Sequence, residues 1–226
     1  DYSRYAAEET LREGYLSVRG GFRVGLCGTA VMKDGESTAL RDLSSAAVRI
    51  AREQRGIGEA VAPRLFRDGR YQNTLLLSPP GGGKTTLLRD LVRQLSQGEG
   101  VPLQRITLID EREEIAVMYR GQPQMDVGPR TDVLSGCPKA LAIPMALRAM
   151  NPQIIAVDEI TVREDLRAIS QAAGCGVALL ATIHAANREE LARKPLFARL
   201  LEMRVFQRIV TITVEDGRRV YRVEAL

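Results

Sequence analysis

The sequence predicts an α/β fold, with a largely parallel sheet over residues 71–226 preceded by a smaller α/β segment over residues 1–70. Three observations lead to this prediction. Apolar strand patterns alternate with helical patterns after residue 71. A glycine-rich run, SPPGGGKTT at 78–86, joins a strand pattern to a helix pattern. A later apolar run ends in two acids at 158–159.

The composition is that of a soluble globular protein. Hydrophobic residues make up 45% of the chain and charged residues 27%. No apolar run approaches the ~18 residues that span a bilayer, and no signal-peptide pattern opens the chain. Cys27, Cys137 and Cys175 are scattered without metal-ligand spacing, which favours a reducing cytoplasm. The chain begins with Asp rather than Met, so we expect a fragment or a processed form.

The chain is basic, with a net charge of +4 and a pI of about 9.1. Almost all of its 32 basic residues are arginines, and they are interleaved with acids. This pattern indicates either contact with nucleic acid or solvated faces and ion pairs between subunits. The second reading is favoured, because 4% aromatic residues provide few platforms on which bases could stack. We therefore expect no nucleic-acid partner.

The first segment has a mixed pattern. It predicts a helix over about 4–13, short strands at 14–18, 22–28 and 29–32, a turn at 33–36 and a second helix over about 59–67.

The glycine-rich run follows a predicted strand at 74–77 and is typical of a phosphate-binding loop. Its glycines let backbone N–H groups surround a polyphosphate, Lys84 reaches the β- and γ-phosphates, and Thr85 offers a hydroxyl to Mg²⁺. Ser78 departs from the pattern GxxxxGK[ST], since it stands where the first Gly belongs. We expect ATP and Mg²⁺ as ligands, with nucleotide bound by Pro80, Gly81, Gly82, Gly83, Lys84, Thr85 and Thr86. A helix with an apolar face should follow, carrying Leu87, Leu88, Leu91, Val92 and Leu95.

The run IIAVDE at 154–159 predicts a buried strand that ends in two carboxylates. Asp158 would hold the Mg²⁺ ion through its water shell, and Glu159 would polarise a water for attack on the γ-phosphate. Further strands are predicted at 105–110 and 177–182, and a final hairpin turns at 215–217. A whole strand separates the loop strand from the Asp158 strand. This order is typical of a RecA-like P-loop NTPase core whose catalytic Glu follows the Mg²⁺-binding Asp.

His184 is the only histidine of the chain and follows the predicted strand at 177–182. At a strand edge facing Asp158 it could sense the γ-phosphate through a hydrogen bond; Thr182 is a weaker candidate for the same task. A lone histidine is more often structural. Its place after the strand next to that of Glu159 favours a catalytic role.

Acids and arginines in two loops are further candidates. Glu111 and, with less support, Glu114 follow the strand at 105–110 and could lie near Mg²⁺ or the attacking water; the alternative is a solvated loop with local ion pairs. Arg130 lies in the polar stretch 126–134, which is expected to be a loop facing a ligand or a neighbouring subunit. Arg148 lies on a predicted helix. Either arginine could instead be a structural pairing residue.

Taken together, these motifs resemble the stage III sporulation protein AA family, ATPases related to the traffic ATPases of type II and type IV secretion. The similarity spans essentially the whole chain. The chain departs from the family pattern at 160–163, where Thr161 and Val162 separate Ile160 from Arg163. The matching stretches are 20–28, 40–45, 48–53, 79–90, 109–116, 127–140, 157–160, 182–185, 194–197 and 206–210.

The resemblance implies an acidic box at 109–114 and a histidine box at 182–185. It also implies a homo-oligomeric ring, expected to be a hexamer, with ATP or ADP near the subunit boundaries. Membrane-embedded sporulation channel proteins would be its partners. The protein would then be cytoplasmic, in the mother cell, and peripheral at the membrane, and would energise a channel between mother cell and forespore.

Arg23, Arg49 and Arg52 are candidates for an arginine finger, because arginines before the core reach the nucleotide in the secretion ATPases that this segment resembles. A guanidinium donates to several phosphoryl oxygens and stays protonated. Positions 49 and 52 would share one face if this stretch were helical. The alternative is pairing with nearby surface acids.

We therefore expect a Mg²⁺-dependent ATPase that drives a secretion-type complex by in-line attack of water on the γ-phosphate. Two other readings stay open. One is a nucleic-acid-dependent ATPase of RecA-like type, which the basic pI favours. The other is a nucleotide-gated scaffold with little turnover, which Glu159 speaks against.

Overall fold

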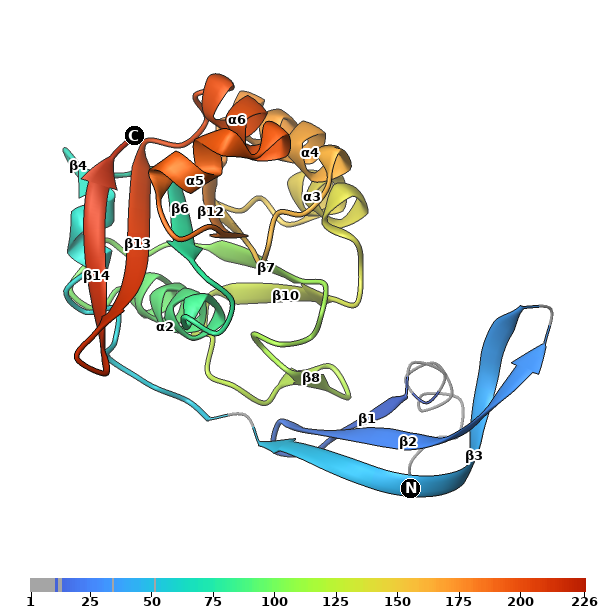
Figure 1. Ribbon diagram of the computed structural model, residues 1–226. Helices are drawn as coiled ribbons and strands as arrows, with labels where there is room; N and C mark the ends of the chain where they lie inside the picture. Colours follow the sequence, from blue (N-terminus) through green and yellow to red (C-terminus); the bar gives the residue numbers. More distant parts are fainter. Residues whose placement is uncertain (1–10, 12–13, 34, 51) are drawn as a thin grey trace. The chain divides into compact units, whose positions relative to one another are not determined.

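The computed structural model describes residues 11, 14–33, 35–50 and 52–226. It divides into two compact units (Figure 1): residues 1–53 with 117–125, and residues 54–116 with 126–226. The expected boundary at residue 70 therefore lies too late, because residues 54–70 belong to the second unit.

The first unit contains a three-stranded antiparallel sheet in the order β1-β2-β3. Its strands are β1 (Tyr15–Val18), β2 (Phe22–Lys33) and β3 (Glu36–Ile50), and a small hairpin adds β8 (Met118–Tyr119) and β9 (Gln122–Pro123). The two short strands predicted at 22–28 and 29–32 are one long strand with a shift of register between Cys27 and Thr29. Gly28 permits this bulge, since a Cβ there would lie 2.6 Å from the Arg41 carbonyl oxygen. Most of the helix predicted over 4–13 lies outside the described residues.

The second unit is built on a seven-stranded sheet in the order β10-β7-β11-β12-β6-β13-β14. Each pairing is parallel except that of β13 with β14, so the predicted α/β fold with a largely parallel sheet is confirmed. The strands are β6 (Thr74–Ser78), β7 (Ile106–Asp110), β10 (Thr131–Ser135), β11 (Ile154–Val157), β12 (Ala178–His184), β13 (Arg208–Glu215) and β14 (Arg218–Ala225). A two-stranded ribbon of β4 (Phe66–Arg67) and β5 (Arg70–Tyr71) stands apart from this sheet.

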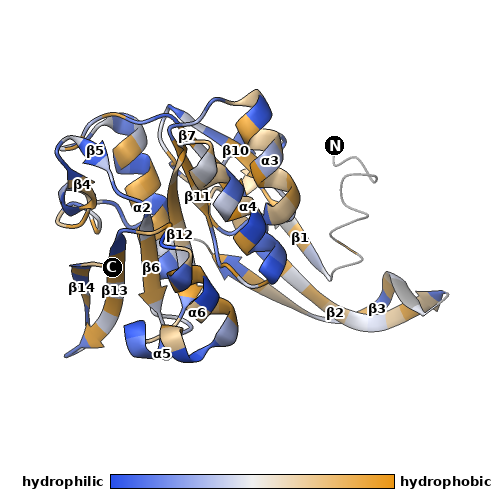
Figure 2. Cartoon of the chain, turned by 90° about the horizontal axis from the view of Figure 1, so that it is seen from above, coloured by the Kyte–Doolittle hydropathy of each residue, from blue (hydrophilic) through white to orange (hydrophobic). Residues whose placement is uncertain are grey.

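Helices cover both faces of this sheet, which is why its central strands are continuous apolar runs. Every residue of β6, β7 and β11 is buried, and Figure 2 shows these strands mostly in the hydrophobic colour. Leu75 and Leu77 of β6 join the apolar cluster that includes side chains of α3, α4, α5 and α6. Leu76 alternates to the opposite face, where α2 packs. The helices are α2 (Lys84–Gln97), α3 (Lys139–Ala149), α4 (Arg163–Gly174), α5 (Arg188–Arg193) and α6 (Pro195–Glu202).

Two local expectations were wrong. Residues 59–67 form turns, the 3₁₀ helix η1 (Ala62–Leu65) and strand β4 instead of a helix. The stretch 126–134, expected to be a loop, ends in β10. This strand is the edge of the sheet and only partly buried, so it lacks the apolar signature of the central strands.

The turns before η1 are tied to α2 by one buried carboxylate. Asp90, whose exposed fraction is 3%, accepts hydrogen bonds from the backbone N–H groups of Gly56 at 3.2 Å and Gly58 at 2.8 Å. It also accepts from Gln94 at 2.7 Å and from the Arg93 guanidinium at 3.0 Å. Asp90 therefore fixes the two glycines that precede residues 59–67, whose own N–H groups make the backbone hydrogen bonds of turns and of η1.

No helix in the described part of the chain is both long enough and apolar enough to cross a membrane.

Replacing Asp90 should destabilise the second unit. Asp90→Ala leaves the buried Arg93 without one of its carboxylate partners and releases Gly56 and Gly58, so we expect a loss of about 3 kcal/mol in the free energy of unfolding. Denaturant unfolding of Asp90→Ala and of Asp132→Ala, an exposed aspartate of β10, measures the difference. Equal midpoints for the two variants would contradict the anchoring role of Asp90.

Candidate functional site

The candidate site lies where the carboxyl ends of the neighbouring strands β6, β12, β11 and β7 meet. Strand register brings His184, the last residue of β12, opposite Ser78, the last residue of β6. Asp158 follows β11 directly, and β7 ends at Asp110. Parallel pairing therefore gathers polar residues from separate parts of the sequence at one sheet edge.

The glycine loop, residues 78–86, leaves β6 and enters α2 at Lys84. Gly83 has a φ of +100°, and a Cβ there would lie 2.6 Å from Arg219 Nε. A Cβ on Gly82 would lie 2.4 Å from Ser78 Oγ, so the loop admits no side chain at either position. Ser78 itself donates to the Pro79 carbonyl at 2.8 Å. It is not among the residues with positive φ, so its backbone conformation does not require the glycine of the pattern. The first N–H groups of α2 lack a side-chain cap and can receive an anion.

Lys84 is a buried cation with several partners at the site. Its exposed fraction is 5%, and Nζ donates to the Ser78 carbonyl at 3.3 Å and lies 2.7 Å from His184 Nδ1. Burial lowers the pKa of Lys84, while the charges of Asp158 and Glu159 oppose that shift. An ammonium group has only donors, so this contact assigns the ring proton of His184 to Nε2.

Asp158 and Thr85 form a small oxygen cluster. Thr85 Oγ1 lies 3.4 Å from one carboxylate oxygen of Asp158, and Thr182 Oγ1 donates to the other at 2.8 Å. No set of three His, Cys, Asp or Glu side chains that could hold a metal occurs within residues 11, 14–33, 35–50 and 52–226. A hydroxyl and one carboxylate do fit a Mg²⁺ ion that draws its other ligands from water and phosphate oxygens.

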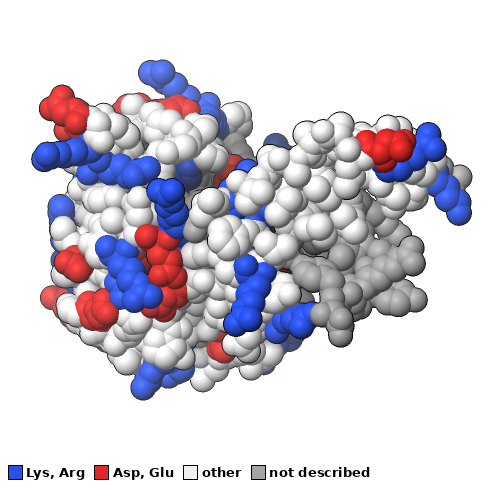
Figure 3. Space-filling view, turned by 90° about the horizontal axis from the view of Figure 1, so that it is seen from below, with Lys and Arg blue, Asp and Glu red and all other residues white. Residues whose placement is uncertain are grey.

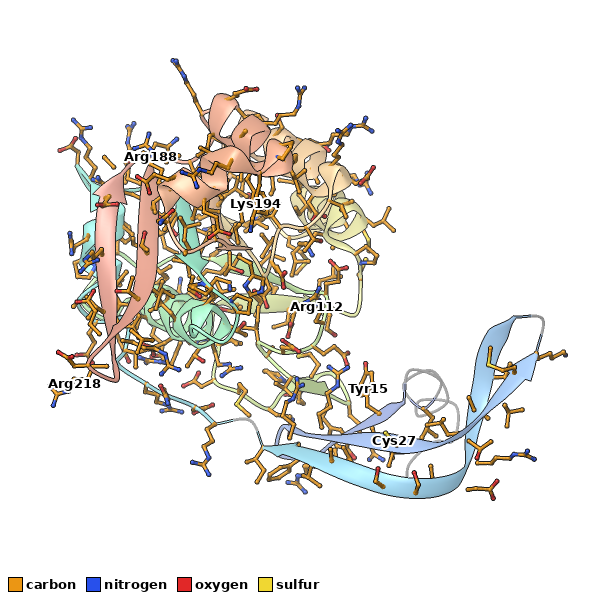
Figure 4. The ribbon with its side chains drawn as sticks, in the orientation of Figure 1. Tyr15, Cys27, Arg112, Arg188, Lys194 and Arg218 are labelled. Atoms are coloured by element: carbon orange, nitrogen blue, oxygen red, sulfur yellow. The ribbon has the colours of Figure 1, made fainter. Side chains whose placement is uncertain are left out.

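Glu159 is held between two other side chains. One carboxylate oxygen accepts from Arg112 at 2.9 Å, and the other lies 3.3 Å from His184 Nε2. Its N–H donates to Asp158 Oδ1 at 3.0 Å and to Thr182 Oγ1 at 2.9 Å. The contacts thus run without a break from Lys84 through His184 and Glu159 to Arg112, which lies on the loop after β7 (Figure 4). This row of contacts links a cation that can bind phosphate to a carboxylate that can accept a proton.

The acids after β7 have other partners. Glu111 pairs with Lys139 at the start of α3; burial would raise the pKa of the Glu111 carboxyl, but the hydrogen bond and charge of Lys139 lower it. Glu114 contributes its backbone, because its N–H donates to Asp110 at 2.9 Å and its carbonyl accepts from Arg89 at 2.6 Å. No hydrogen bond or ion pair joins Glu111 to Asp158 or Glu159 in the part of the chain that is described.

Asp110 is a third carboxylate near the site, which the sequence reasoning did not single out. It is fully buried and accepts N–H groups of Glu114, Ile115 and Ala116. Burial raises the pKa of Asp110, the three N–H groups oppose the shift, and the negative charge of Asp158 adds to it. Its position at the end of a predicted strand was the available signal.

The candidate arginines Arg130 and Arg148 make no hydrogen bond or ion pair with this cluster among the described residues. Arg130 precedes β10, and its N–H donates to Ser96 Oγ at 2.7 Å. Arg148 is exposed in the last turn of α3. No side-chain hydrogen bond or ion pair of either residue occurs within the described ranges, so a role for them stays a prediction.

The three candidate finger arginines belong to the first unit. Arg23 stacks over the ring of Tyr15, with its guanidinium carbon 3.5 Å from the ring centroid. Arg49 is a strand residue opposite Arg23 on β2, and Arg52 follows the strand. The helical spacing proposed for Arg49 and Arg52 is therefore wrong, since long alternating strands β2 and β3 pair through this stretch. Their role as fingers stays a prediction.

Two contacts were missed by the sequence reasoning. Arg112 holds Glu159, as described above, and lies in a run in which only Glu111 and Glu114 were proposed for catalysis, with local ion pairs as the alternative. Arg219 of β14 donates from Nε to the Gly82 carbonyl at 3.1 Å and thereby supports the glycine loop. Nothing in the local sequence connects this hairpin to the loop; only the sheet order does.

Solved structures with the same fold include the ATPase DotB and the pilus retraction motor PilT. The ATPase DotB of Legionella pneumophila matches with a TM-score of 0.58 and 17% identity over 91% of this chain. The pilus retraction motor PilT, solved with bound ADP, matches with a TM-score of 0.55 and 18% identity over 96% of this chain. The chain spans 57% of the DotB structure and 65% of the PilT structure. These similarities confirm the P-loop ATPase fold.

Two curated relatives match most of the chain. The stage III sporulation protein AA of Bacillus subtilis (strain 168) is 42% identical over 218 residues, which are 96% of this chain and 71% of that protein. The uncharacterized protein ycf45 of Cyanidium caldarium is 27% identical over 179 residues, which are 77% of this chain and 49% of that protein. A family model described as sporulation stage III, protein AA matches residues 1–223. The chain therefore belongs to the family of the stage III sporulation protein AA.

Proposed function

We propose that this protein is a Mg²⁺-dependent ATPase that hydrolyses ATP to ADP and phosphate and acts as the motor of a secretion-type complex during endospore formation. The observation that carries the proposal is the continuous contact between Lys84, His184 and Glu159 beside the glycine loop. A cation for phosphate, a polar sensor and a general base lie in one row. Lys84 begins α2, His184 ends β12 and Glu159 lies two residues after β11.

The glycine loop and Lys84 bind the phosphates. The N–H groups at the start of α2 and the Lys84 ammonium together surround a β- and γ-phosphate. When phosphate arrives, the Lys84 ammonium exchanges its bond with His184 for phosphate oxygens. A bound Mg²⁺, held by Thr85 and by Asp158 directly or through water, would supply positive charge against the developing charge of the phosphoryl group.

Glu159 acts as the general base in hydrolysis. Its carboxylate can accept the proton of the attacking water while Arg112 and His184 fix its orientation. Once released from Lys84, Nδ1 of His184 is free to accept a hydrogen bond from the attacking water beside the γ-phosphate, while Nε2 keeps its contact with Glu159. Thr182 keeps Asp158 in place through the hydrogen bond to its second oxygen.

Assembly and partners are a further part of the proposal. A homo-oligomeric ring would let Arg23, Arg49 or Arg52 complete the nucleotide site in cis or from an adjacent subunit. By family, the partners are membrane-embedded sporulation channel proteins, and the protein acts in the mother-cell cytoplasm, peripheral at the membrane. A nucleic-acid-dependent ATPase is the less favoured reading, because Figure 3 shows basic and acidic groups interleaved on the face in view.

Lys84→Ala should lose nucleotide affinity. The change removes a charged donor to the phosphates, a contact worth about 1.5–3 kcal/mol, so the Kd for ATP should rise roughly tenfold to hundredfold. Titration of a fluorescent ATP analogue measures it, with Lys33→Ala, an exposed lysine at the end of β2, as control. Unchanged affinity in Lys84→Ala would remove the glycine loop from the proposed site.

Glu159→Gln should bind ATP and lose hydrolysis. The amide is nearly isosteric with the carboxylate but cannot accept the proton, so turnover should fall roughly 10²-fold or more. Phosphate release and ATP affinity are measured separately, and Glu164→Gln on α4 serves as a matched control. Turnover at the wild-type rate in Glu159→Gln would show that another group is the base.

His184→Ala should bind ADP nearly normally and hydrolyse ATP about tenfold more slowly, the effect of one lost hydrogen bond to the γ-phosphate or the attacking water. His184→Asn, which keeps a short polar side chain, should recover part of the rate. The measurement compares turnover with the Kd values for ADP and ATP. A large loss of ADP affinity would instead indicate that His184 only supports the loop through Lys84.

Replacing the three candidate finger arginines one by one should identify the finger. Loss of a finger typically lowers turnover on the order of 10³-fold with a modest effect on binding. Arg23→Ala, Arg49→Ala and Arg52→Ala are assayed for turnover and ATP affinity, with Arg41→Ala, an exposed arginine of β3, as control. If all three variants turn over like the control, the first unit has no direct part in the chemistry.

A further inference from the structure

A groove outside the nucleotide site lies between α4 and the segment of α6 and its C-terminal cap. Its volume is about 410 Å³, within the range of ligand-binding pockets. One wall is a single face of α4, with Arg163, Leu166, Arg167 and Ser170 at helical spacing. The other wall is Pro195, Leu196, Arg199 and Met203. All eight residues belong to the second unit.

The groove carries three arginine side chains that make no ion pair among the described residues. Arg163, Arg167 and Arg199 are exposed, and no hydrogen bond or ion pair of their side chains occurs in the described part of the chain. Asp165, next on α4, points elsewhere, because its carboxylate accepts the N–H groups of Thr161 and Val162. The three guanidinium groups at this groove can therefore bind carboxylate or phosphate oxygens.

The floor of the same groove is apolar. Leu166 has an exposed fraction of 4%, and Leu196 and Met203 are half-buried. A ligand that fills the groove must therefore combine anionic groups with apolar side chains. Free phosphate would leave the floor empty, and a flat lipid surface would not reach it. None of the eight lining residues is aromatic, so the groove has no platform for stacked bases.

We propose that the groove docks an acidic, leucine- or methionine-bearing segment of a partner protein. The carboxylates of the segment pair with Arg163, Arg167 and Arg199, and an apolar side chain enters between Leu196 and Met203. Arg163, the first residue of α4, lines this groove. The proposal does not depend on ATP hydrolysis.

The test uses fluorescein-labelled peptides of roughly seven residues, about two helical turns, in which Glu and Leu or Met occupy every arrangement with at least two acids. Anisotropy with the whole chain should find members that bind, whereas the same set with Lys in place of Glu should not bind. Arg167→Glu combined with Arg199→Glu should weaken binding at least tenfold. Arg188→Glu combined with Arg218→Glu changes exposed arginines of α5 and β14 outside the groove (Figure 4) and should leave the affinity unchanged.

A second measurement locates the binding. With ¹³C-labelled methionine methyl groups, the bound peptide should shift the Met203 signal and leave that of Met118 in the first unit unchanged. The melting temperature of each variant shows that it is folded. The proposal is overturned if no acidic peptide shifts Met203, or if the two double variants weaken binding equally. It is also overturned if vesicles of phosphatidylglycerol, and no peptide, bind in a manner that Arg167→Glu with Arg199→Glu abolishes.

Discussion

The constraint on which the site depends is the parallel sheet buried on both faces. Because helices cover both sides, the strands must be apolar along their length, and polar groups can gather only where the strands end. Four neighbouring strands end at Ser78, Asp110, Val157 and His184. The register sets His184 opposite Ser78, and it sets Val157, which directly precedes Asp158, opposite Ala181 and Ile109. A shift of one residue in β12 would reverse which side chains face the core and would remove His184 from Lys84 and Glu159.

The buried cation of Lys84 imposes a second constraint. A charge removed from water must be paired or hydrogen-bonded, and here the Ser78 carbonyl and the His184 ring satisfy it. Phosphate oxygens would be stronger acceptors for the same ammonium. The lowered pKa of Lys84 in the structure follows from its burial, and a polyphosphate anion in the loop would favour the charged form and oppose that shift.

Much of this arrangement could be predicted from the sequence. The glycine loop, the Asp158–Glu159 pair and the apolar strands were visible because they are local patterns of residue type and spacing. Arg219 and the Glu111–Lys139 pair could not be predicted in this way, since each joins segments that only the sheet order or a helix start brings together. The edge strand β10 was missed for a related reason: half-buried strands lack a continuous apolar run. The turns at residues 59–67 could not be predicted from their own pattern. Asp90, far along the chain on α2, binds the glycines that precede them.

The row of contacts from Lys84 to Arg112 also suggests why binding and hydrolysis would be coupled under the proposed function. His184 lies between Lys84 and Glu159, with Nδ1 facing the ammonium group and Nε2 facing the carboxylate. Phosphate that draws Lys84 away frees one nitrogen of the ring without disturbing its contact with the carboxylate. Arg112 meanwhile keeps the other oxygen of Glu159 in place, so the base retains its orientation as the histidine changes partner. A site built from separate, unconnected groups would need a second device to report that the phosphate has arrived; here the imidazole, with its two distinct nitrogens, can do so.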